Sequence, residues 1–105
     1  MPPNPNAFTG PNPGTRFDFA PGFDCTMAQT VTELSICQSP VLATLDQELN
    51  SLYQYRRNQG TSASQKFIKE FQSLWLQVRD MCGADVYCIE QRYHEQIDFL
   101  WNYSG

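Results

Sequence analysis

The chain has 105 residues and a mass of 12.0 kDa, which is the size of one domain and leaves no room for a second. It carries seven Lys and Arg against eleven Asp and Glu, so its net charge at pH 7 is −4. This balance argues against nucleic-acid binding, which requires a basic face, and favours a basic protein partner. No apolar run approaches the roughly 18 residues of a membrane-spanning helix, so we expect no transmembrane segment.

The first 22 residues contain six of the seven prolines and three of the six glycines. This composition predicts a flexible Pro-rich arm at residues 1–22 rather than a helix. The stretch from Arg16 to Phe19 alternates polar and apolar residues, as an extended strand does. The phenylalanines of the arm either dock on the folded part of the chain or contact a partner. Arg16, Phe17 and Phe19 are therefore candidate partner contacts.

The region after the arm has the periodicity and the capping signals of helices. Thr30 and Glu33 fit a capping box that opens a short helix ending near Cys37. Ser39 before Pro40 predicts the start of a second helix, which runs to about Asn58. The apolar positions of this second helix recur at helical spacing: Leu42, Leu45, Leu49, Leu52 and Tyr53.

Two further helices are predicted. Ser62 with Gln65 is a candidate capping box for the third helix, which Gly83 ends, and Asp85 is a candidate cap for the fourth. The stripe expected to face the core in the third helix is Phe67, Phe71, Leu74, Val78 and Met81, flanked by Ile68 and Trp75. The stripe of the fourth helix is Val86, Ile89, Tyr93, Ile97 and Leu100, widened by Trp101. Three amphipathic helices with short connections predict an all-α domain at residues 23–105, an antiparallel three-helix bundle preceded by one helical turn.

Four cysteines in so short a chain are typical of an exported domain that is stabilised by disulfides: Cys25, Cys37, Cys82 and Cys88. The hydrophobic core of a domain of about 75 residues is rarely stable enough without such cross-links. Met1–Asn6 have neither the basic nor the apolar region of a signal peptide, so we expect the sequence to be that of a mature chain. A periplasmic or extracellular location is therefore inferred from the cysteines alone.

The positions of the cysteines favour sequential pairing. A bridge between Cys82 and Cys88 would clamp the corner between two helices, and one between Cys25 and Cys37 would fasten the arm to the first helical turn. Four cysteines allow three connectivities, and the sequence leaves the other two open.

Metal binding and catalysis find little support in the sequence. The cysteine spacings lack the close pairs of zinc sites, and His94 is the only histidine, with no nucleophile and orienting group spaced around it. Glu90, Glu95 and Asp98 are interpreted as a solvated helix face. We therefore expect no metal, no cofactor and no enzymatic activity.

Four charged residues border or enter the apolar stripes: Asp46, Arg56, Arg79 and Glu90. Charges at such positions are rarely left unpaired. We interpret them as structural polar pairs that join helices and fix their register, with the arginine stems packed over apolar neighbours. The alternative interpretation is a polar pocket that captures a ligand.

The order of several short motifs identifies a resemblance. They are Phe23-Asp24-Cys25, Glu33-Leu34-Ser35-Ile36-Cys37, Leu45-Asp46-x-x-Leu49-x-x-x-Tyr53, Gln72-x-x-Trp75-x-x-x-Arg79-Asp80-x-Cys82, and then Cys88 and Tyr93. Over residues 23–100 the chain resembles the LprI-like lysozyme-inhibitor family, and it departs from the pattern at Gln96, near a position where the family often has Arg. The resemblance implies a small exported helical bacterial protein with two disulfides and, for some members, inhibition of host-type lysozyme by direct binding. It assigns no matched residue as an inhibitory contact.

Two functional hypotheses follow. The first is an inhibitor of a basic lysozyme-type muramidase, which would bind through the arm or through the loop at 58–62, with Asn58, Gln59 and Thr61 as candidate contacts. The second is a cell-envelope interaction protein, such as an adaptor, an assembly factor or an immunity protein, without lysozyme-related activity. The sequence leaves the oligomeric state undetermined.

Overall fold

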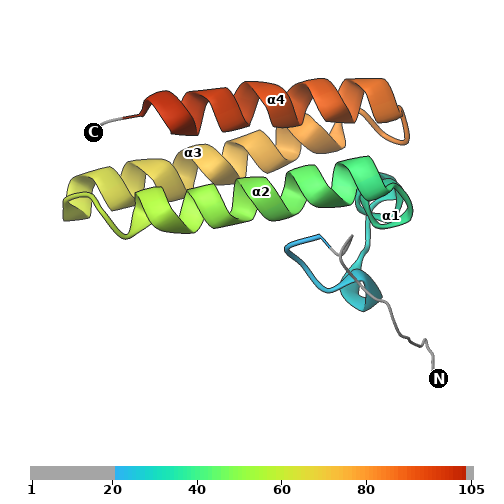
Figure 1. The fold of residues 1–105 in the computed structure, drawn as a ribbon, viewed down its shortest axis with the longest axis horizontal. Coiled ribbons are helices and arrows are strands. Elements are labelled where there is room, and N and C mark those ends of the chain that lie inside the picture. The colour runs from blue at the N-terminus through green and yellow to red at the C-terminus, as the bar shows by residue number, and fades with distance from the viewer. Residues whose placement is uncertain (1–20, 104–105) are drawn as a thin grey trace.

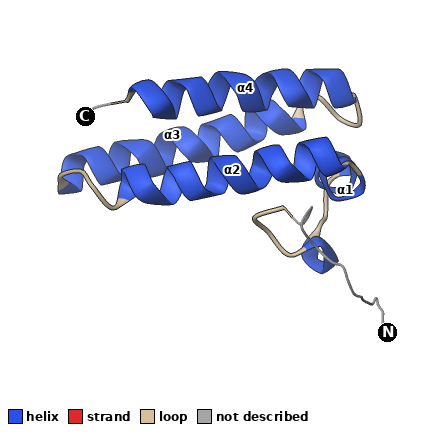
Figure 2. Ribbon diagram, viewed as in Figure 1, coloured by secondary structure: helices blue, strands red, loops and turns tan. Residues whose placement is uncertain are grey.

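A computed structural model describes residues 21–103, which form four α-helices and one 3-10 turn and contain no strand (Figure 2). The 3-10 turn η1 spans Cys25–Met27, and the helices are α1 at Val31–Gln38, α2 at Pro40–Arg57, α3 at Ser62–Asp80 and α4 at Val86–Asn102. The all-α prediction is confirmed. The predicted arm lies outside the described residues, except for Pro21 and Gly22.

The three long helices lie side by side, and consecutive ones run in opposite directions (Figure 1). The short helix α1 lies across the end where α2 begins and α3 ends. The Thr32 hydroxyl fixes it there, because it donates a 2.7 Å hydrogen bond to the carbonyl oxygen of Gly83. No helix within the described part of the chain is long and apolar enough to span a membrane.

Side-chain caps begin each helix. The capping box at Thr30 and Glu33 is present, and Ser39 and Asp85 cap α2 and α4 as expected. The prediction for α3 is wrong by one residue, since Thr61 is the cap and its side chain accepts a hydrogen bond from the backbone of Ser64. Each such cap contributes about 1 kcal/mol to helix stability.

All four helices contribute to one apolar core, so α1 is an integral part of the fold rather than a preceding turn. The buried cluster consists of Ile36 from α1, Leu42, Leu49 and Leu52 from α2, Trp75 from α3, and Ile89, Tyr93, Ile97 and Leu100 from α4. Full burial of each of these large side chains stabilises the fold by roughly 1.5–3 kcal/mol. Phe23 packs against the cluster from the segment before η1.

The prediction of which face of α3 is buried is wrong. Four of its members are exposed: Phe67, Leu74, Val78 and Met81. The face turned toward the core instead carries Ser64, Ile68, Trp75 and Arg79. It is rotated by about 100° from the predicted face, because Ile68 directly follows Phe67 and each residue turns the helix by about 100°. Phe71 lies between the two faces, and its ring packs at a tilt against that of Phe99 of α4, with 4.5 Å between ring centroids.

The stripe predicted for α4 is mostly buried, but its two outer members are not. Val86 is 47% exposed and Trp101 is 61% exposed. Gln96, which lies outside the predicted stripe, is also buried, and its amide donates a hydrogen bond of 2.9 Å to the side-chain oxygen of Gln72 of α3. A buried polar pair of this kind avoids the cost of an unsatisfied amide.

Candidate functional site

A buried arginine lies at the centre of the polar residues between the helices. Arg79 of α3 is 3% exposed, and its Nη2 lies 2.8 Å from Oδ1 of Asp80. The same guanidinium lies 3.9 Å from Glu33 of α1 and 4.0 Å from Asp46 of α2. Asp46 and Arg79, both predicted to join helices through polar pairs, thus lie near each other. The shortest hydrogen-bonded link between them runs through Tyr93.

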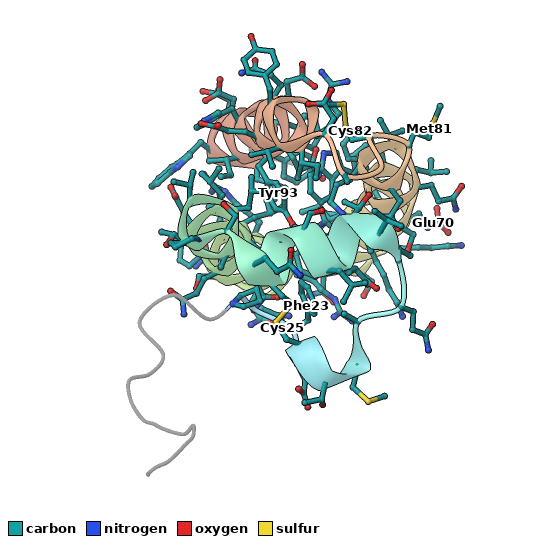
Figure 3. The ribbon with its side chains drawn as sticks, turned by 90° about the vertical axis from the view of Figure 1, so that its right-hand side faces the viewer. Phe23, Cys25, Glu70, Met81, Cys82 and Tyr93 are labelled. Atoms are coloured by element: carbon teal, nitrogen blue, oxygen red, sulfur yellow. A yellow bond between two sulfur atoms is a disulfide. The ribbon has the colours of Figure 1, made fainter. Side chains whose placement is uncertain are left out.

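Tyr93 of α4 connects these charges. Its hydroxyl donates a 2.6 Å hydrogen bond to Oδ1 of Asp46 and accepts one of 3.2 Å from Nη1 of Arg79. Burial, reinforced by the negative charge of Asp46, raises the pKa of the Tyr93 phenol far above its ordinary value. The phenol therefore stays protonated and remains a donor. Figure 3 shows Tyr93 pointing into the space between the helices, where its ring packs edge-on against Trp75.

A hollow of about 430 Å³ lies over this network. It is lined by Gly22, Phe23, Glu33, Asp46, Leu49, Asn50, Tyr53, Lys69, Gln72, Ser73, Trp75, Leu76, Arg79 and Asp80. The start of the described chain lies at its rim, because the backbone N–H of Gly22 donates a 2.7 Å hydrogen bond to Oδ2 of Asp46. A side chain at position 22 would collide with Asn50, since a Cβ there would lie 2.8 Å from the Cβ of Asn50.

The carboxylates of this network already have hydrogen-bond partners within the chain. Asp46 and Tyr93 are partnered, and the carboxylate of Glu33 accepts hydrogen bonds from the backbone N–H groups of Gln29 and Thr30. The first of these bonds, despite partial burial, holds the pKa of Glu33 below its usual value. A catalytic carboxylate pair would instead need one acid with a raised pKa. The network therefore fits the interpretation of charges that fix helix register.

Arg56 and Glu90, predicted to take part in inter-helix salt bridges, make other contacts in the structure. Arg56 pairs with backbone rather than with a carboxylate, because its Nε and Nη2 each donate a 2.7 Å hydrogen bond to carbonyl oxygens, of Leu100 and Trp101 respectively. These carbonyls end α4, where a cation is favoured by the helix dipole. Glu90 lies 3.4 Å from Nε2 of His94, one turn along the same helix, and so joins no second helix there.

Both disulfides have the sequential pairing favoured from the sequence. Cys25 in η1 is bonded to Cys37 at the end of α1, with 6.0 Å between their Cα atoms. Cys82 is bonded to Cys88 across the turn between α3 and α4, with 5.6 Å between Cα atoms. Gly83 lies inside this second loop with φ of +60°, a backbone conformation that favours glycine.

The candidate contact residues in the connection between α2 and α3 are exposed: Asn58, Gln59 and Thr61. They lie at the end of the bundle opposite α1 (Figure 1). Thr61 also caps α3, so that residue has a structural role in addition to any contact. The other candidates, Arg16, Phe17 and Phe19, lie outside the described residues.

Two members of the polar network, Tyr93 and Glu33, have roles that the sequence patterns do not predict. The sequence places Tyr93 in an apolar stripe and Glu33 in a capping box, and it places both in the family motifs, but none of these patterns pairs them with Arg79. Their pairing with Arg79 depends on how three helices pack together, and the sequence of one helix does not indicate this packing. Among residues 21–103, no group of three or more His, Cys, Asp or Glu side chains is arranged to hold a metal ion.

Comparison with known proteins identifies the family. No curated protein and no solved structure matches the chain. The family described as "Lysozyme inhibitor LprI" matches residues 24–100. This stretch includes both disulfides and all four helices, apart from the last two residues of α4. This is a family of inhibitors rather than of enzymes. The chain therefore belongs to the LprI lysozyme inhibitor family.

Proposed function

We propose that this protein is an exported inhibitor that binds a lysozyme-type muramidase directly and blocks its cleft. The observation that carries the proposal is the family match over residues 24–100. The two disulfides support an oxidising compartment, either the periplasm or the extracellular space. They also hold the scaffold in one conformation, which lowers the entropy cost of binding.

The charge of the chain suits such a partner. Lysozymes are basic proteins, and a net charge of −4 would steer encounter with them. Their cleft, however, contains two carboxyl groups. An inhibitor that is acidic as a whole can enter this cleft with a locally basic or polar segment.

The turn between α2 and α3 is the segment that we propose for this role. It presents Asn58, Gln59 and Thr61 at one end of the bundle, and Arg57 immediately precedes them. Arg56 is engaged with the carbonyl oxygens that end α4. The guanidinium of Arg57 lies 6.0 Å from the centre of the Tyr53 ring, and it is the cation that we propose for an acidic cleft. The arm residues Arg16, Phe17 and Phe19 remain a second proposed contact.

The test is inhibition of muramidase activity by the oxidised protein and by an Arg57→Ala variant. We expect inhibition that weakens as salt is raised, because long-range attraction is screened over about 8 Å at physiological ionic strength. Loss of an anchoring arginine at an interface costs 2 kcal/mol or more, so Arg57→Ala should weaken inhibition about 30-fold. Arg92→Ala is the control, because Arg92 forms a surface pair with Glu95 on α4.

The outcomes separate two parts of the proposal. Equal inhibition by both variants would remove the turn as the contact while leaving inhibition intact. A stable complex that retains full muramidase activity would exclude inhibition itself.

A further inference from the structure

The hollow between α2 and α3 has an apolar lining beneath its polar rim. This lining comes from Leu49 and Tyr53 of α2 and from Trp75 and Leu76 of α3. Leu76 is 39% exposed, although it lines a hollow that both helices share. The volume of about 430 Å³ lies within the range of cavities that hold a small ligand, roughly 300–1,000 Å³. The hollow can therefore take large side chains from a further segment.

The chain that leads into η1 already lies along this hollow. Gly22 and Phe23 both line it, and the backbone N–H of Gly22 donates its 2.7 Å hydrogen bond to Asp46 there. Gly22 also lies against Asn50, one turn further along α2, where a Cβ would have no room. The residues that precede η1 therefore begin at the rim of the hollow, and 21 residues of the sequence come before Gly22.

Two phenylalanines of the arm are close enough to Gly22 to reach the hollow. Phe19 and Phe17 lie three and five residues before it, and extended chains of these lengths span at most about 10 and 17 Å. The rise along α2 from Asp46 to Tyr53 is about 10 Å for seven residues. Phe19 can therefore reach the end of the hollow at Tyr53.

The sequence next to Gly22 favours an extended approach to the hollow. The residue before a proline is biased toward extended backbone, and here Ala20 precedes Pro21. In an extended chain, successive side chains point to opposite sides. Phe17 and Phe19 would thus share one side, which can face the apolar lining, while Asp18 on the other side stays at the rim.

A lysine at the rim suits the charge of Asp18. Lys69 is exposed and lines the hollow, and within the described part of the chain it forms no salt bridge. We propose that residues 17–19 dock in this hollow of their own chain. The ring of Phe19 then packs against Tyr53, and the carboxylate of Asp18 pairs with Lys69.

Docking of the arm regulates how it meets a partner. Phe17 and Phe19 face the hollow in the docked arm, so a partner that takes these rings must first displace them. Arg16, which alternates with them, stays on the outer side. The hollow and a partner therefore compete for the same two rings. The docking itself does not depend on the proposed inhibition of lysozyme.

Limited proteolysis tests the docking. Chymotrypsin cleaves after phenylalanine, so the bond after Phe19 reports on the docked segment and the bond after Phe8 reports on the chain outside the hollow. Leu76→Glu places a charge in the apolar lining, and it should speed cleavage after Phe19 at least about 10-fold, because cleavage follows the population of the open form. Cleavage after Phe8 should keep its native rate. Leu74→Glu is the matched control, since Leu74 is 60% exposed on α3 outside the hollow, and it should leave both rates unchanged.

Charge reversal tests the pair at the rim. Lys69→Glu places two carboxylates together and should speed cleavage after Phe19 by about 2- to 5-fold, the size of a surface ion-pair effect. Asp18→Lys in the same chain should restore the native rate. Lys66→Glu, at an exposed position of α3 outside the hollow, should leave the rate unchanged.

Fluorescence of Trp75 gives a second measurement. The chain has two tryptophans, so in a Trp101→Phe background only Trp75 in the lining of the hollow emits. Addition of Phe17→Ser/Phe19→Ser should increase the quenching of Trp75 by acrylamide and shift its emission to longer wavelength, because the arm no longer covers it. Phe8→Ser in the same background should change neither. Circular dichroism checks that each variant keeps its helices.

Three results would overturn the proposal. The first is cleavage after Phe19 at the same rate in the native chain and in Leu76→Glu. The second is an equal gain in that rate in Leu76→Glu and Leu74→Glu, which would indicate a general loosening of α3. The third is protection of the bond after Phe19 only when lysozyme is added, which would make the arm a contact for that partner.

Discussion

The hydroxyl group of Tyr93 on α4 donates a 2.6 Å hydrogen bond to Oδ1 of Asp46 on α2. Arg79 of α3 donates to the same hydroxyl, so one phenol oxygen joins the three long helices. The surrounding core is apolar, and in such an environment a polar group must be paired to be tolerated. The helices can therefore slide past one another only by breaking this contact.

Replacement of Tyr93 by Phe tests the contribution of the hydroxyl. The variant keeps the ring against Trp75 but leaves Asp46 and Arg79 without a shared partner. Unsatisfied buried groups cost about 1–3 kcal/mol, so we expect the free energy of unfolding to fall by that amount. Urea unfolding gives the value. Tyr87→Phe, at an exposed position of the same helix, should change it by less than about 0.5 kcal/mol.

Removal of the buried guanidinium should be more costly. Arg79→Met leaves the carboxylates of Asp46 and Asp80 near each other without their cation, and loss of one partner from a buried pair typically costs about 3–5 kcal/mol. Arg92→Met is the matched control, because its pair with Glu95 lies on the surface and contributes about 0–1 kcal/mol. Equal losses in the two variants would contradict a structural role for the Arg79 network.

The stability of the protein should fall in acid, in part through Glu33. The backbone N–H of Gln29 holds the pKa of Glu33 below the ordinary value of 4.5. Because the folded-state pKa is the lower one, the stabilisation is fully present above the unfolded value and is lost as pH falls through the folded value.

A Glu33→Gln variant isolates this effect. Glutamine keeps an oxygen that can accept the capping hydrogen bonds but does not titrate. Urea midpoints measured from neutral pH down to about pH 3 should therefore fall less steeply below about pH 4.5 than those of the native chain. Glu70→Gln, at an exposed position on α3, serves as the control. If the urea midpoints of Glu33→Gln fell with pH as steeply as those of the native chain, Glu33 would not contribute to the loss of stability in acid.

The disulfide between Cys82 and Cys88 should stabilise the corner between α3 and α4. Its removal in a Cys82→Ser/Cys88→Ser variant should lower the free energy of unfolding by about 2–3 kcal/mol, mainly because the unfolded chain gains conformational entropy without the cross-link. Peptide mapping without reductant checks the connectivity. Recovery of a peptide that links Cys37 to Cys82 from the native protein would contradict the pairing described above.

The sequence predicted the helices more reliably than the faces they bury. Caps are local, so Thr30, Ser39 and Asp85 could be recognised from neighbouring residues. The two apolar faces of α3 lie about 100° apart, and periodicity alone favoured the more continuous one. The buried face is the one that brings Arg79 to Tyr93, and that requirement exists only once α4 is in place.

The polar contacts show the same limit. Asp46 and Arg79 could be identified because charges beside an apolar stripe need partners. The partners of Arg56 are backbone carbonyl oxygens at the end of α4, and no residue type signals these in a sequence. Asn58 and Gln59 could be proposed as contacts from the sequence because they lie in a short connection between two helices, and such connections are exposed.

The central claim is that this member of the LprI family inhibits a muramidase by occupying it. The most direct measurement is the rate of cell-wall hydrolysis at a fixed lysozyme concentration while the oxidised protein is added in increasing molar ratio. We predict that the rate falls in proportion to the added protein and levels off at a ratio of one. An unchanged rate, under conditions where sedimentation shows the complex to be fully formed, would contradict the claim and favour a binding role in the cell envelope instead.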